Sequence, residues 1–163
     1  MTEHREPCDY RRTAIAIALW SCRKDPAAMT KLIEGSDDPQ HVLMDQAIVA
    51  GVLLKTAAGN TEAIFTKSNL AEIAVSQISG AEPDQIASEI SAAHLASAVL
   101  AMPQMAQHLC DDAARWASAP VAFFTCATAY RLAGEPPEGL LQQMAEAPSA
   151  DALVDIVVRG RRP

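Results

Sequence analysis

Proline and glycine divide this sequence into short segments, and their spacing limits the fold to a set of short helices. Pro26 and Pro39 each follow an aspartate, which is typical of a helix start because the acid caps the first turn and proline tolerates its first position. Gly35 and Gly59 stand where these two helices should end. Further starts are expected at Asn69, Pro83, Pro103, Pro120, Pro136–Pro137 and Ser149. The pattern predicts about eight or nine short helices.

The residues between these breaks favour helices over strands. About a fifth of the chain is Ala, the best helix former, whereas strand-like runs of Val, Thr and Tyr are missing. Apolar residues make up 50% of the chain, which is enough for a core. We therefore expect an all-α fold, a compact orthogonal multi-helix bundle formed as a single domain over residues 1–163.

Two segments are apolar on nearly every side, and a helix without a polar face should be surrounded by others. They lie at residues 47–54, within the helix expected from Asp38 to Gly59, and at residues 121–133. We expect these two to be the central helices. Their sequences run parallel at an offset of about 75 residues. Residues 26–66 and 101–141 are therefore either duplicated halves or a chance match between Ala/Leu-rich segments.

The charge balance argues against direct binding to nucleic acid. The formal net charge is −7, which repels phosphate backbones unless basic residues gather on one face. Arginines occur near both ends of the chain, where they are more typical of solvated tails: Arg11, Arg12, Arg159, Arg161 and Arg162. An acidic surface steers towards basic partners, so the composition favours a basic protein as partner.

Cysteine usage and hydropathy suggest a cytoplasmic protein. The four cysteines, Cys8, Cys22, Cys110 and Cys126, form no CxxC pair, and three of them fall within helical patterns, so we expect reduced thiols. Arg11 precedes an apolar run from residue 14 to residue 20, but acidic residues before it and its short length disfavour a signal peptide. No segment reaches the roughly 18 apolar residues of a membrane span, so no membrane partner is expected.

No pattern in the sequence identifies a catalytic, metal or cofactor site. His41 with Asp45, and His108 with Asp112, share helical faces, but the Glu-x-x-His and His-Glu-x-x-His patterns of helical metal sites are missing. The His–Asp spacing fits weak pairing on a helix surface better than a metal site. The segment from residue 70 to residue 90 has the length of a helix-turn-helix, but its second helix would carry no Lys or Arg. We expect no cofactor, no metal and no enzyme activity.

Three functions remain as hypotheses. The first is a non-enzymatic protein-interaction module (an adaptor, an inhibitor or a small subunit of a larger assembly) that binds a partner protein or a second copy of itself. Its interface candidates are large amphipathic or adaptable side chains: Trp20, Trp116, Met102 and Met105. The second is a ligand-binding or enzyme domain with an apolar pocket between the central helices, lined by His94, Phe123, Phe124, Cys126 and Tyr130. The third is an accessory subunit of a nucleic-acid-processing complex. The Ala/Leu-rich composition suggests a bacterial or phage source.

Overall fold

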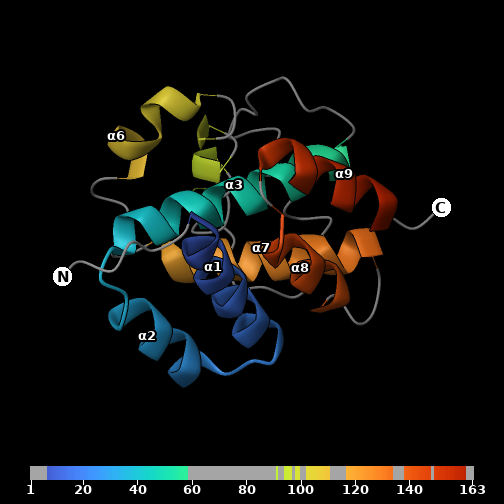
Figure 1. Cartoon of the computed structure of the whole chain (residues 1–163). Coiled ribbons are helices and arrows are strands. Elements are labelled where there is room, and N and C mark those ends of the chain that lie inside the picture. Colours follow the sequence, from blue (N-terminus) through green and yellow to red (C-terminus); the bar gives the residue numbers. More distant parts are fainter. Residues whose placement is uncertain are drawn as a thin grey trace.

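The protein is helical throughout the part that the structure describes. The computed structural model describes residues 7–58, 91, 94–96, 98–99, 102–110, 117–133, 138–147 and 149–160. The elements are α1 (Pro7–Cys22), α2 (Pro26–Glu34), α3 (Pro39–Ala58), the 3-10 turn η1 (Pro103–Met105), α6 (Ala106–Cys110), α7 (Ser118–Ala133), α8 (Glu138–Ala145) and α9 (Ala150–Gly160) (Figure 1). These residues contain no strand, and the predicted all-α class is confirmed.

The helix starts predicted from proline and its neighbours are formed by capping side chains. Three such side chains accept hydrogen bonds from backbone N–H groups: Asp25 from Ala28 (3.1 Å), Asp38 from His41 (3.1 Å) and Ser149 from Ala152 (3.2 Å). Gly35 follows the last residue of α2, as expected. The predicted starts at residues 69 and 83, and part of the possible duplication, lie outside the described residues.

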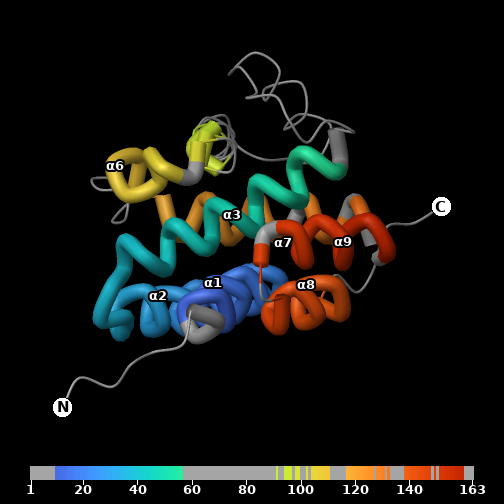
Figure 2. The backbone as a smooth tube through the Cα atoms, turned by 45° about the horizontal axis from the view of Figure 1, so that its top comes forward, coloured from blue at the N-terminus to red at the C-terminus, as the bar shows by residue number. Residues whose placement is uncertain are grey.

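Helices α3 and α7 pack against each other along the middle of the molecule (Figure 2). Their shared core also includes residues of α6 and of the segment before it. Its buried members are Leu43, Ala47, Ala50, Leu54, Ala96, Val99, Ala106, Cys110, Ala117, Val121 and Phe124. Residues 47–56 of α3 are buried apart from the half-buried Ile48. This burial agrees with the apolar character of the segment on every side. Helix α7 differs, because Phe123 and Tyr130 are 38% and 51% exposed.

A second core fills the space between α1, α3, α8 and α9. It contains Ile15 and Ala18 of α1, Leu53 of α3, Leu141 of α8 and Leu153 of α9 among others. Within the apolar run at residues 14–20, Ala14, Ile15, Ile17 and Ala18 are buried, and the other three residues are half-buried. Within the described ranges, no helix has both the length and the apolar character needed to cross a membrane.

Five of the buried polar side chains form hydrogen bonds of two kinds. Buried threonines donate to the carbonyl four residues earlier in their own helix: Thr56 to Val52 (2.8 Å), Thr125 to Val121 (2.7 Å) and Thr128 to Phe124 (2.8 Å). Between helices, the Ser118 hydroxyl donates to the Gln46 side-chain oxygen (2.6 Å), and the Gln46 amide donates back to the Ser118 carbonyl (3.0 Å). This reciprocal pair joins α3 to the start of α7.

A disulfide corrects the expectation that the cysteines in the helical patterns are reduced. Cys22, the last residue of α1, is bonded to Cys126 in α7, and their Cα atoms are 5.6 Å apart. This separation lies within the range that a disulfide requires. Sequence spacing gave no sign of the pair because 104 residues separate the two positions and only the packing of α1 on α7 brings them together. Cys110 is a free, buried thiol, as expected.

Candidate functional site

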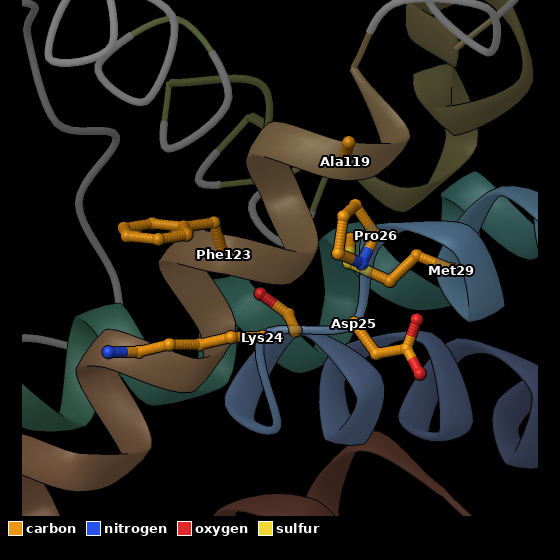
Figure 3. Close-up of a pocket in the computed structure, with 7 residues that line it drawn as sticks. Lys24, Asp25, Pro26, Met29, Ala119 and Phe123 are labelled. Carbon is orange, nitrogen blue, oxygen red and sulfur yellow. The ribbon is translucent and has the colours of Figure 1, made fainter.

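An apolar hollow lies between α7 and the corner that connects α1 to α2. It has a volume of about 280 Å³ and is open to solvent. Seven residues line it: Ser21, Lys24, Asp25, Pro26, Met29, Ala119 and Phe123 (Figure 3). We refer to it as the Phe123 hollow. Its surface is almost entirely carbon, since Lys24 contributes mainly its aliphatic stem.

The α1–α2 corner that forms one wall of the hollow is held by backbone hydrogen bonds. The Asp25 N–H donates to the carbonyl of Trp20 (3.0 Å), and the Lys24 N–H donates to that of Ser21 (3.0 Å), the pattern of a Schellman cap. Lys24 adopts φ 56°, a left-handed conformation that this cap usually assigns to glycine. Pro26 then begins α2 directly. Two tight structures, a helix cap and a proline start, therefore fix this wall.

The other wall continues into an exposed face of α7. Ala119, Phe123, Cys126 and Tyr130 follow one another at intervals of four, three and four residues, so they lie along one side of the helix. Two of them are large and exposed, Phe123 at 38% and Tyr130 at 51%. The Cys22–Cys126 disulfide lies between them along the helix and covalently links the two walls. Helix α7 therefore presents an exposed stripe with two aromatic side chains, next to a hollow whose walls are linked by the disulfide.

The structure separates the residues that we predicted to line a pocket between the central helices. Phe124 is buried in the α3–α7 core, whereas the adjacent Phe123 lies on another side of α7 and lines the hollow. Tyr130 shares the exposed face with Phe123, and Cys126 is in the disulfide. His94 is half-buried and does not line the hollow. The concave surface thus lies between α7 and the α1–α2 corner.

Three of the predicted interface residues, Trp20, Met102 and Met105, do not line the hollow. Trp20 packs against the cluster that contains Ile17 and Met29, and the Arg23 guanidinium lies over its ring, 5.1 Å from the centroid. Met105 is 41% exposed at η1, beside the half-buried Met102. Trp116 lies outside the described residues. Sequence reasoning identified only Phe123 among the lining residues and missed the other six: Ser21, Lys24, Asp25, Pro26, Met29 and Ala119. The Asp-Pro signal marked this corner as a helix start only.

A second group of interacting polar side chains surrounds Asp45. Arg11 donates to the Asp45 carboxylate from 3.2 Å and to the Ala147 carbonyl, just after α8, from 3.0 Å. His41 approaches the other carboxylate oxygen at 3.8 Å, and its ring stacks on Tyr10 with centroids 4.1 Å apart. Burial raises the pKa of Asp45 from its usual value, although Arg11 and His41 both act to lower it.

The side chains around Asp45 connect helices to one another. The Arg11–Asp45 ion pair joins α1, α3 and the end of α8, and both side chains are about nine-tenths covered. In the described part of the chain, no three His, Cys, Asp or Glu side chains converge as a metal site would require. His108 is exposed on α6, and its predicted neighbour Asp112 lies outside the described residues.

The third site is a buried lysine, Lys55. It is 1% exposed near the end of α3, and its Nζ has no hydrogen-bond partner among the described residues. Burial lowers the pKa of this ammonium group, because desolvation disfavours the charged form. The charge therefore opposes folding at neutral pH.

Replacing Lys55 by Met is expected to stabilise the protein by about 1 kcal/mol or more at pH 7, because a similar volume is kept without an unpaired polar group. The stabilisation should shrink as the pH rises towards 10.5, the usual lysine value. The unfolded chain binds more protons than the folded one in this range, so raising the pH stabilises the wild type. Urea unfolding at pH 7 and pH 10 measures both effects. If the stability difference between Lys55→Met and the wild type is the same at pH 7 and pH 10, the expected pH dependence is wrong.

Comparison with known proteins does not add to this geometry: no family model, curated protein or solved structure matches the chain. The three sites differ in their access to solvent. Asp45 and Lys55 are buried, whereas the Phe123 hollow is open and has an exposed aromatic ring at its edge. The hollow is therefore the site best placed to meet another molecule.

Proposed function

We propose that this chain is a non-enzymatic protein-interaction module whose docking surface is the Phe123 hollow and the adjacent stripe of α7. The observation that carries the proposal is the exposure of Phe123 and Tyr130 on the same helical face, with the hollow beside Phe123. Aromatic side chains are enriched at the energetic centres of protein interfaces. A recess next to an exposed ring is suited to receive one apolar side chain of a partner.

The structural support of the hollow also favours docking. The helix cap at Lys24 and Asp25, the proline start of α2 and the disulfide hold its walls in place before anything binds. A preformed surface loses less conformational entropy on association than a mobile one does. The volume of about 280 Å³ lies at the lower limit for small-molecule pockets, which favours the side chain of a protein over a whole cofactor.

Site-specific photo-cross-linking tests this function. Benzoylphenylalanine placed at Phe123 or Tyr130 of the full chain, in the cells that make the protein, should give a discrete adduct with one protein or with a second copy. The matched control is Val158, an apolar residue of α9 that is 54% exposed. Because Phe123 is exposed, replacing it should alter the free energy of unfolding by less than about 1 kcal/mol.

A second variant links any adduct to the hollow. Ala119 is exposed on α7 and lines the hollow, so Ala119→Trp should fill the recess without disturbing the core. This variant should remove the adduct at Phe123 and leave the melting temperature close to that of the wild type. The proposal fails if no adduct forms at Phe123 or Tyr130, or if Val158 gives the same adduct in the same yield.

A further inference from the structure

The positive charge beside the hollow is opposite in sign to the charge of the whole chain. Lys24 lines the hollow and is exposed at the α1–α2 corner, in a protein of formal net charge −7. Figure 3 shows the Lys24 side chain running beneath Phe123, with its ammonium group on the same side of the hollow as the aromatic ring. A partner side chain that contacts the ring would therefore meet a positive charge.

The carboxylate of the acid that lines the hollow, Asp25, lies away from this ammonium group. The Asp25 carboxylate points away from Phe123, to the opposite side of the hollow (Figure 3). It accepts the hydrogen bond from the Ala28 N–H that begins α2, so it serves as a helix cap. The end of the hollow that carries the Phe123 ring therefore has a positive charge from the α1–α2 corner.

We infer that the partner presents an acidic segment, in which an apolar side chain that fills the Phe123 hollow is flanked by Asp or Glu. The inference rests on the proposed function and adds the chemical class of the partner. The apolar side chain would pack between Phe123, Met29 and Ala119, and the carboxylate would lie within reach of Lys24. This sign is opposite to the basic partner that net charge alone suggests, because contact charges beside a binding site set specificity at short range.

A peptide library selected on the full chain tests the class of partner. Random linear peptides displayed on phage should yield sequences in which Asp or Glu flanks a large apolar residue. The affinity of one enriched peptide is then measured by fluorescence polarisation on the wild type and on four variants. Phe123→Ala should abolish binding, and Lys24→Glu should weaken it about tenfold. Arg23→Glu should weaken it less, because the Arg23 guanidinium lies over the Trp20 ring and does not line the hollow. Lys31→Glu is the matched control, because Lys31 is exposed on α2 but does not line the hollow, and its affinity should be unchanged.

The outcomes separate the two proposals. Enriched peptides that are neutral or basic, yet lose binding in Phe123→Ala, would overturn the acidic partner and leave the docking surface in place. Peptides that bind Phe123→Ala as well as the wild type, or the failure of any peptide to enrich, would count against the docking surface itself. Equal weakening by Lys24→Glu and Lys31→Glu would show a response to net charge only, and that result also overturns the inference.

Discussion

Reduction of the Cys22–Cys126 disulfide is expected to lower the free energy of unfolding by about 4 kcal/mol, the largest effect of any single change considered for this chain. The bond joins residues 104 positions apart, and closing so long a loop removes much of the entropy of the unfolded chain. For a domain of this size, the loss corresponds to a decrease of roughly 10 °C in melting temperature. Urea and thermal unfolding with and without a phosphine reductant measure it.

The matched control for this experiment is a variant that cannot form the disulfide. The double variant Cys22→Ser/Cys126→Ser should have the stability of the reduced wild type and should not respond to the reductant. Cys110 is buried, so alkylation of the folded, oxidised protein should spare it and both disulfide sulfurs. Rapid alkylation of Cys22 and Cys126 in the absence of reductant would contradict the bond.

Removal of the Arg11 side chain should cost about 3 kcal/mol of stability at pH 7. Arg11→Ala leaves the Asp45 carboxylate buried without its cation and the Ala147 carbonyl without its donor. Its neighbour provides the control. Arg12 pairs with Glu146 at the same distance, 3.2 Å, but both side chains are more than half exposed, so Arg12→Ala should cost less than about 1 kcal/mol. Chemical denaturation of the two variants at one pH makes the comparison.

The pH dependence of the Arg11→Ala variant gives a second readout. The pKa of Asp45 is already raised by burial, and loss of Arg11 removes a charge that lowers it. The folded variant then binds more protons than the unfolded chain above the ordinary aspartate range, so its stability decreases as pH rises. The difference in free energy of unfolding between Arg11→Ala and the wild type should therefore be smaller at pH 5 than at pH 7. A difference that is equal at both pH values, or equal to that of Arg12→Ala, would show that the buried ion pair contributes little.

Much of the helical framework could be predicted from the sequence because its signals are local. Asp25, Pro26 and Gly35 mark the bounds of α2 within a few residues, and Ser149 caps α9 as expected. Each of these signals depends on hydrogen bonds made within one helical turn, so no knowledge of the tertiary structure is needed.

The candidate site could not be predicted because it depends on which face of α7 is covered. Phe123 and Phe124 are adjacent in a segment that is apolar on all sides, and periodicity cannot identify the solvent face of such a helix. Only the packing of α7 against α3 buries Phe124 and leaves Phe123 beside the α1–α2 corner. The Cys22–Cys126 and Arg11–Asp45 pairs were missed for the same reason, because each joins residues on different helices.

The reciprocal pair between Gln46 and Ser118 has a consequence for the uniqueness of the native state. The α3–α7 contact is lined largely by Ala, Val and Leu, and apolar side chains alone specify a unique packing less strictly than paired polar groups do. The hydroxyls of Thr56 and Thr125 add no register, because each donates to a carbonyl of its own helix. Any shifted alignment would leave the Gln46 amide and the Ser118 hydroxyl buried and unpaired. Together with the disulfide, the pair thus favours one alignment of α3 and α7, and its loss is expected to make the core heterogeneous before the chain unfolds.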